Sequence, residues 1–312
     1  MPQLGLGCAQ LGDLWAPMQD DEAEAIVSAA WDAGIRYFDT APHYGVGLSE
    51  QRLGHALEGR PRDEFVLSTK VGRLLDPPVG RTTDVRGAAG EKVSRRWDFS
   101  RDGVLRSLDS SLDRLGLDRI DIALLHDSGD CLDDARTTGY EALAELRDEG
   151  LISAIGAGDG NVETLIRLVR DCDIDVILLA GRLTLLDRSA LAELVPLCGE
   201  RGVRIIAAGV FNTGVLAADE PEGAMFEYRA ADDAVVAKAR ELGAFARAHG
   251  AALPQLAMQY PLTFAEVCTV LVGADSAEQI RESADLMARS IPGAVWDELA
   301  QIETQEREET SW

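Results

Sequence analysis

The segment YFDTAPHYGVGLSE (37–50) places a carboxylate and a phenol close together in the chain. Asp39 ends a short apolar run, and Tyr44 follows five residues later in a glycine-flanked loop. Two later apolar runs, FVLSTKV and IDIALLH, carry Lys70 and His126 at their ends. If these runs are neighbouring strands of a parallel barrel, their carboxyl ends meet on one face and the four side chains converge.

These four residue types together are suited to moving a proton on or off a carbinol oxygen. A phenol with a pKa of ~10 exchanges protons poorly near neutrality, and a nearby Lys ammonium stabilises the phenolate and lowers that pKa. Asp39 would pair with Lys70, because a partly buried ammonium needs a partner. His126 would hydrogen-bond the substrate oxygen and the Tyr44 hydroxyl. With no obvious nucleophile and no metal cluster in the set, the natural complement is hydride transfer to or from a nicotinamide.

Each of the four residues alone has an ordinary structural explanation. A strand-end Asp is usually a cap, a Tyr usually packs, a Lys at a strand end usually extends its ammonium to water, and a lone His is usually a hydrogen-bonded structural residue. Their occurrence together on three consecutive predicted strands favours the catalytic interpretation.

Eight short apolar runs predict eight strands, and amphipathic segments separate them. Strand and helix in alternation predict a parallel sheet, and strands rich in Val, Ile and Leu suit burial on both faces. Eight such units predict a closed (β/α)8 TIM barrel, formed as a single domain by residues 1–312, with a doubly wound open sheet as the rival. The predicted strands are 4–8, 37–39, 65–71, 120–126, 153–157, 176–180, 203–208 and 269–273.

The helical segments carry recognisable end signals. The segment 20–33 opens with an acidic first turn and ends before Gly34, and 100–115 has Ser100 as an N-cap and Gly116 beyond its end. Residues 72–99 break the alternation, and they predict a long loop over the carboxyl-terminal face of the barrel that acts as a lid or substrate wall. The other predicted helices are 140–149, 161–171, 187–200, 232–248 and 276–289.

Composition restricts the class of partner. The chain has 54 acidic and 30 basic residues and a net charge of −24, which disfavours nucleic acid and membrane partners. Its five Cys are an odd number without a C-x-x-C pair, so they predict neither disulfides nor zinc. The N-terminus lacks a signal peptide pattern, and we expect a cytoplasmic protein acting on a small molecule. The oligomeric state is not predicted.

The segments YFDTAPHYG, LSTK and ALLH resemble the aldo-keto reductase superfamily, whose members are (β/α)8 barrels with an Asp, Tyr, Lys, His tetrad. The resemblance covers most of the chain and implies that Asp39, Tyr44, Lys70 and His126 are the catalytic residues.

A narrower resemblance is to sugar 1-dehydrogenases of the L-fucose, D-threo-aldose and L-galactose type, with pyridoxal 4-dehydrogenase as a close relative. It rests on TAPHYGVGLSEQRLGHAL, WDFSRDGVLRSLDSSLDRLGLDRIDI, LLAGRLTLLD and GVFNTGVLA. It implies oxidation of a cyclic aldose at C1 to the lactone, with reduction of NAD(P)+.

The resemblance also indicates where the dinucleotide binds. Many NADPH-using relatives carry Lys-Ser and then an Arg after the last strand, whereas VLVGADSAEQIRES (270–283) has no such clamp and adds Asp275. This favours NAD over NADP. Sugar-oxidising relatives read Gly-Ala-Gly-Met-Asn after the fifth strand, where this chain reads GAGDGN (156–161), which displaces the Asn to Asn161 or removes it. The implied cofactor contacts are Asn161, Phe211, Asn212, Gly214, Leu216, Gly273, Ser276 and Gln279.

Three other functions remain open on the sequence alone. The first is an aldehyde or ketone reductase acting on a pyridoxal-like or biosynthetic substrate. The second is a nucleotide-binding barrel without catalysis. The third is an unrelated lyase or isomerase that uses Lys70 as a Schiff base.

Overall fold

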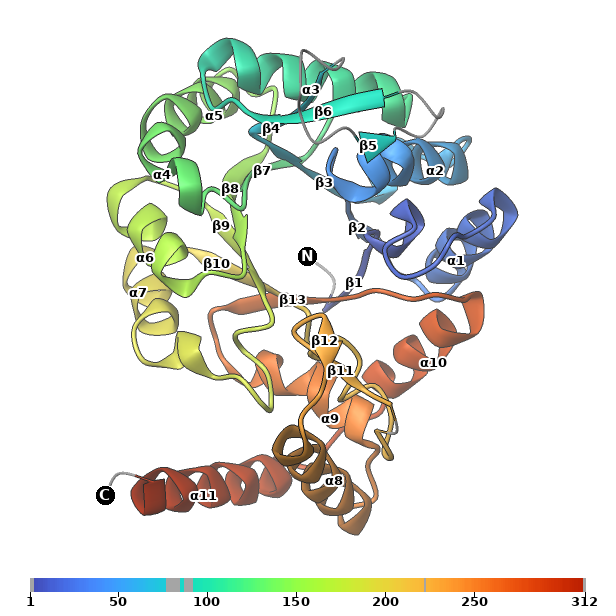
Figure 1. Cartoon of the computed structure of the whole chain (residues 1–312), viewed down its shortest axis with the longest axis vertical. Coiled ribbons are helices and arrows are strands. Elements are labelled where there is room, and N and C mark those ends of the chain that lie inside the picture. Colours follow the sequence, from blue (N-terminus) through green and yellow to red (C-terminus); the bar gives the residue numbers. More distant parts are fainter. Residues whose placement is uncertain (1–2, 77–84, 87–91, 222, 311–312) are drawn as a thin grey trace.

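Eight parallel strands form a closed barrel in the computed structural model, which describes residues 3–76, 85–86, 92–221 and 223–310 (Figure 1). The strands lie in the order β1-β13-β10-β9-β8-β7-β3-β2, so the predicted barrel and all eight predicted strands are confirmed. Their bounds are β1 Leu4–Gly7, β2 Tyr37–Asp39, β3 Val66–Val71, β7 Ile122–His126, β8 Ala154–Asp159, β9 Val176–Ala180, β10 Arg204–Ala208 and β13 Val267–Val272.

Helices surround the barrel, and their ends follow the sequence signals. Ser100 caps α3 by accepting from the Gly103 amide, and Gly116 ends that helix in the left-handed region. The predicted helix 187–200 is divided into a 3-10 turn, Ser189–Leu191, and the α-helix α7. The barrel helices are α1 Asp20–Asp32, α2 Leu48–Leu57, α3 Arg101–Leu115, α4 Leu132–Asp134, α5 Tyr140–Asp148, α6 Val162–Asp171, α7 Leu194–Arg201, α9 Leu253–Gln259 and α10 Ala277–Ala288.

Two helices lie outside the ring of barrel helices (Figure 1). The helix α8 (Asp233–Ala248) packs on α9, and α11 (Gly293–Thr310) extends away from the barrel. The sequence predicted α8, but it did not predict α9 or α11. No helix in the described part of the chain is long and apolar enough to cross a membrane.

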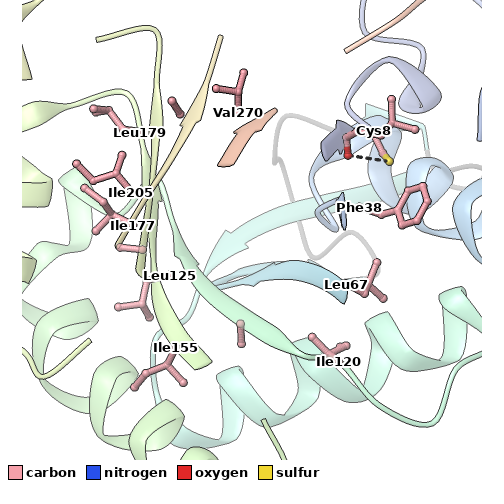
Figure 2. Packing of buried hydrophobic residues seen from close by; sticks show 14 of the residues in the cluster. Cys8, Phe38, Leu67, Ile120, Leu125, Ile155, Ile177, Leu179, Ile205 and Val270 are labelled. Atoms are coloured by element: carbon pink, nitrogen blue, oxygen red, sulfur yellow. Dashed lines mark hydrogen bonds between the residues drawn. The ribbon is translucent and has the colours of Figure 1, made fainter. Parts of the chain in front are cut away.

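Alternation along the strands separates an inner from an outer set of side chains. The inner set fills the barrel and comprises Tyr37, Ile122, Leu124, Val176, Leu178, Ile206 and Leu271. The outer set packs between strands and helices, and Figure 2 shows part of it, including Phe38, Leu67, Leu125, Ile155 and Ile177. Because inner residues alternate with outer ones, the inner positions nearest the carboxyl ends of β2, β3 and β7 fall on Asp39, Lys70 and His126.

The described part of the segment 72–99 contains β-strands, whereas the sequence predicted a loop. It contains β4 (Arg73–Asp76), β5 (Val85–Arg86) and β6 (Lys92–Trp97), which form an antiparallel sheet in the order β4-β6-β5. A second short hairpin, β11 (Met225–Phe226) and β12 (Arg229–Ala230), follows β10. The register of β4 and β6 places Arg73, Leu75, Arg95 and Trp97 on one face. Residues 77–84 and 87–91 of this segment lie outside the described residues.

Candidate active site

A buried ion pair occupies the carboxyl-terminal end of the barrel interior. The Lys70 ammonium donates to Asp39 Oδ2 at 2.7 Å and to the Thr40 carbonyl at 3.0 Å. Both charged side chains are almost fully buried. Although burial alone lowers the pKa of Lys70, the charge of Asp39 raises it above its usual value, so Lys70 stays protonated.

A hydrogen-bonded chain beneath the ion pair fixes the carboxylate. The Ser68 hydroxyl donates to Asp39 Oδ1 at 2.7 Å, and the Tyr37 hydroxyl lies 2.9 Å from Ser68 Oγ. Since Ser68 donates its only proton to Asp39, Tyr37 donates to Ser68. Both oxygens of Asp39 therefore have a donor, and its orientation toward Lys70 is set from below. Sequence inspection did not identify Tyr37 or Ser68 as supporting residues, because neither lies at the carboxyl end of a strand.

Tyr44 lies on a 3-10 turn, Tyr44–Gly47, directly after the β2 loop. The turn is pressed against the loop after β1: a Cβ added to Gly12 would lie 2.5 Å from the Tyr44 carbonyl carbon, and one added to Gly45 would lie 2.6 Å from Gly12 Cα. Glycine is therefore required at both positions for the two backbones to approach this closely. The Lys70 ammonium lies 4.7 Å from the centre of the Tyr44 ring.

The pKa of Tyr44 is raised, whereas the sequence analysis expected Lys70 to lower it. Burial raises it, and the opposing charge of Lys70 lowers it by a smaller amount, so the pKa stays above that of a free phenol. Lys70 thus acts in the predicted direction, but the desolvation of a buried phenol outweighs it. The free protein holds Tyr44 as a neutral phenol at neutral pH.

His126 is a neutral imidazole between Tyr44 and His43. Its ring stands edge-on to both, with centroid separations of 5.9 Å in each case. Burial, followed by the positive charges of Lys70 and Arg73, lowers its pKa well below the usual value. Burial also lowers the pKa of His43 to about 4. The Nδ1 atoms of both His side chains are buried and have no hydrogen-bond partner among the described residues.

Two carboxylates lie at the carboxyl ends of β7 and β8. Asp127, in the left-handed region at φ +42°, lies with Oδ2 3.5 Å from His126 Nε2 and 3.2 Å from Arg73 Nη1. The second is Asp159, the last residue of β8, which is 8% exposed. The Arg73–Asp127 ion pair joins β4 to the carboxyl end of β7.

Comparison with known proteins identifies the family of this chain. The model of the aldo/keto reductase family matches residues 3–304. The chain belongs to the aldo-keto reductase family. It is therefore an oxidoreductase that uses NAD(P).

The aldo-keto reductases most similar to this chain include two dehydrogenases. A D-threo-aldose 1-dehydrogenase of a Pseudomonas species is 45% identical over 308 residues, covering 96% of this chain and 94% of the relative. A pyridoxal 4-dehydrogenase of Microbacterium luteolum is 38% identical over 316 residues, covering 95% and 92%. Among solved structures, the holo form of an aldo-keto reductase from Bacillus halodurans is 28% identical with a TM-score of 0.76, covering 96% of this chain and 91% of that one.

The turn after β10 combines left-handed backbone with a buried side-chain oxygen that has no partner among the described residues. Asn212 and Thr213 have φ of 45° and 63°, and Gly214 has φ of 105°. Such backbone is strained for a β-branched residue and is typical of ligand-binding sites. Asn212 donates to the Gly181 carbonyl, while its buried Oδ1 has no partner among the described residues. This turn fits a nicotinamide dinucleotide better than a purely structural role.

The start of α10 lies beside this turn, because β10 pairs with β13. Ser276 caps α10 by accepting from the Gln279 amide, and the Gln279 side chain accepts from the Asp275 amide at 2.7 Å. The Gln10 side chain lies against Gly273, where an added Cβ would be 2.1 Å from Gln10 Nε2. The sequence did not point to Gln10, since its position is set only by the fold.

Three further predicted cofactor residues are engaged in packing or capping. Asn161 caps α6 on the β8 side of the barrel, with its Oδ1 accepting from the Thr164 amide. Leu216 is fully buried with the residues around α8 and α9, and Phe211 is partly buried beside it. Asp159, and not Asn161, is the polar residue at the end of β8. The GAGDGN segment, which differs from the Gly-Ala-Gly-Met-Asn of sugar-oxidising relatives, contains it.

Proposed function

We propose that this protein oxidises a cyclic aldose at C1 to the corresponding lactone, with NAD+ as the preferred acceptor. The observation that carries the proposal is the Lys70 ammonium, held by Asp39 at 2.7 Å and set against the Tyr44 ring. That arrangement supports Tyr44 as the proton-exchanging group, and the 45% identity to a D-threo-aldose 1-dehydrogenase supports an aldose as the substrate.

In the proposed mechanism, the anomeric hydroxyl of the sugar lies against Tyr44 and His126. Tyr44 first loses its own proton to solvent and, as the phenolate with Lys70 as its counter-charge, then takes the hydroxyl proton. The C1–H electron pair leaves as hydride, and the C1–O bond becomes the carbonyl of the lactone. Bound NAD(P)+ supplies the hydride acceptor. Asp39 holds Lys70 in place, and neutral His126 donates a hydrogen bond to the substrate oxygen without adding charge.

We propose Asp39, Tyr44, Lys70 and His126 as the catalytic residues. For the cofactor we propose contacts from Phe211, Asn212 and Gly214 after β10 and from Gly273, Ser276 and Gln279 after β13. Leu216 shapes this region through packing, and Asn161 supports the β8 side through its cap. These residues lie on the described part of the chain, and their cofactor roles follow from the family resemblance.

The preference for NAD rests on the residues after β13. Positions 273, 274, 275 and 279 hold Gly, Ala, Asp and Gln rather than Lys or Arg. The Asp275 carboxylate would also repel a 2′-phosphate. The Gln279 side chain is already bound to the Asp275 amide. We expect the double variant Asp275→Ser with Gln279→Arg to raise kcat/KM for NADP+ by about tenfold relative to NAD+. An unchanged ratio would contradict the preference.

The proposal is tested with the wild-type protein by measuring the formation of reduced cofactor, which absorbs at about 340 nm. NAD+ and NADP+ are each offered with L-fucose, D-arabinose, L-galactose and pyridoxal. We expect NAD+ to be reduced fastest with a sugar. Pyridoxal is included because of the 38% identity to a pyridoxal 4-dehydrogenase. Turnover of pyridoxal with silence on every sugar would replace the aldose by a pyridoxal-like aldehyde as substrate.

A further inference from the structure

Asp159 is a buried carboxylate with half of its hydrogen-bonding capacity unused. Its Oδ1 accepts from the Asn161 amide at 2.8 Å, whereas its buried Oδ2 has no partner among the described residues. The side chain is 8% exposed and forms no ion pair with any described residue. A buried carboxylate without a cation is destabilising, so this one requires either a bound positive charge or a structural reason to persist.

The other acids at the mouth of the barrel already have cations. Asp39 is paired with Lys70 at 2.7 Å, and Asp127 with Arg73 at 3.2 Å. His126 and His43 are neutral, because burial lowers the pKa of each. Burial, and then the charge of Asp127, raises the pKa of Asp159 above its usual value. Asp159 therefore contributes the negative charge at this mouth that no ion pair neutralises within the described residues.

The position of Asp159 relative to the proton-exchanging groups is set by strand register. Gly158 pairs with His126 between β8 and β7, and the Asp127 amide donates to the Gly158 carbonyl at 2.9 Å. A Cβ added to Gly158 would lie 3.4 Å from Lys70 Cε. The backbone of β8 thus passes directly beside Lys70 and His126, and Asp159 is the next residue along it.

Hydride transfer restricts where the nicotinamide ring can lie. The substrate oxygen must be within hydrogen-bond reach of Tyr44, and the reacting carbons must be about 3–3.5 Å apart. A bound ring would therefore lie near Tyr44 and His126, at the mouth where β8 ends. A carboxylate there would face a ring that is positively charged when oxidised and neutral when reduced.

We propose that Asp159 is the counter-charge for the oxidised nicotinamide ring, so that the protein holds NAD(P)+ more tightly than NAD(P)H. This inference deepens the proposed function, because an enzyme that oxidises sugars must release reduced cofactor after each turnover. The attraction exists while the ring is a cation and disappears once the ring has received the hydride with its electron pair. Asp159 accordingly favours dissociation of the reduced product.

Binding measurements without sugar test the role of Asp159. Dissociation constants are measured by titration calorimetry for NAD+ and NADH, and for NADP+ and NADPH, since both pairs share the same ring. In Asp159→Asn, which retains an acceptor for the Asn161 amide, we expect the Kd ratio of oxidised to reduced cofactor to rise about tenfold. Asp159→Ser removes the same charge and should shift the ratio in the same direction. Asp109→Asn is the matched control, because it removes one charge from an exposed position on α3.

Several outcomes would overturn the role proposed for Asp159. An unchanged ratio in both Asp159 variants is one, and equal weakening of both redox forms is another, since that indicates a charge-independent hydrogen bond. A shift of similar size in Asp109→Asn would also overturn it, by showing a net-charge effect. A change confined to the KM of the sugar would assign Asp159 to the substrate instead. Because no sugar is present in the titrations, failure of the aldose panel and failure of this proposal are distinguishable.

Discussion

The two ends of the barrel differ in how their polar groups are satisfied. A cavity of about 490 Å³ opens at the amino-terminal end, lined by the first residues of β7, β8, β9 and β10. There Arg204 donates to the Ala265 carbonyl, and Asp175 accepts from both Arg147 and the Ile155 amide. At the carboxyl-terminal end, buried polar atoms of His43, His126, Asp159 and Asn212 have no partner among the described residues.

The difference shows that space alone does not mark the reactive face. Buried polar atoms are ordinarily hydrogen-bonded, and exceptions need an explanation. In the amino-terminal cavity Arg204 and Asp175 serve the fold, because their partners are other parts of the protein. At the carboxyl-terminal end the unused donors and acceptors are available to ligands, as expected for the active face of a (β/α)8 barrel. The following predictions test this contrast, from the largest expected effect to the smallest.

Removing the phenol should have the largest effect on the reaction. In Tyr44→Phe we expect turnover to fall by about 10²–10⁴-fold, the usual contribution of a positioned acid/base group. Cofactor affinity should stay near that of the wild type, since the ring is retained. Steady-state kinetics and a cofactor titration on the same sample check both statements. Turnover within about threefold of wild type would remove Tyr44 from the mechanism.

Breaking the buried ion pair should reduce both stability and turnover. Asp39→Asn leaves the Lys70 ammonium without its counter-charge, and we expect the free energy of unfolding to fall by about 3–5 kcal/mol. The matched control is Asp173→Asn, whose carboxylate pairs with Arg147 but is 84% exposed, and it should change by less than about 1 kcal/mol. Urea unfolding of the two variants measures both. Equal changes in unfolding free energy would show that burial does not make the Asp39–Lys70 pair more important for stability than an exposed pair.

The neutral imidazole of His43 should make the folded protein sensitive to acid. Its pKa is about 4 in the folded state, against ~6.5 in the unfolded state. The unfolded chain therefore binds more protons, so this contribution to the free energy of unfolding is present above pH ~6.5 and declines by up to about 3 kcal/mol as the pH falls toward 4.

Replacing His43 should make the protein less sensitive to acid. Unfolding free energies at pH 7 and pH 4.5 should differ less in His43→Gln than in the wild type, because the titrating imidazole is gone. His55→Gln is the control, since the His55 side chain is 69% exposed. The interpretation fails if the two variants have the same pH dependence.

The smallest effect is expected at the amino-terminal end. Cys268 lines the cavity there, and its thiol donates to the Ile205 carbonyl at 3.4 Å. Cys268→Ser retains a donor at this position, and we expect kcat and KM within about twofold of wild type, a change far below one order of magnitude in rate. Steady-state kinetics provides the comparison with Tyr44→Phe. A tenfold loss of kcat would mean that a change in this cavity affects the reaction at the other end of the barrel.

The sequence determined most of the fold and the identity of the central residues. Eight apolar runs separated by capped amphipathic segments define the barrel, because alternation of strand and helix forces a parallel sheet. Asp39, Lys70 and His126 were found because the carboxyl ends of neighbouring strands must lie together. The pairing of Asp39 with Lys70 followed from the need of a buried ammonium for a partner.

Only the tertiary structure decided which contacts surround this centre. The Ser68–Tyr37 chain under Asp39 joins inner positions on two strands, and no local pattern marks such a pairing. The helix α9, which the sequence did not predict, packs beside β13, because long-range packing outweighs local periodicity. The isolation of Asp159 likewise emerged only in three dimensions, since whether a carboxylate is neutralised depends on which cations the fold brings within a few ångströms of it.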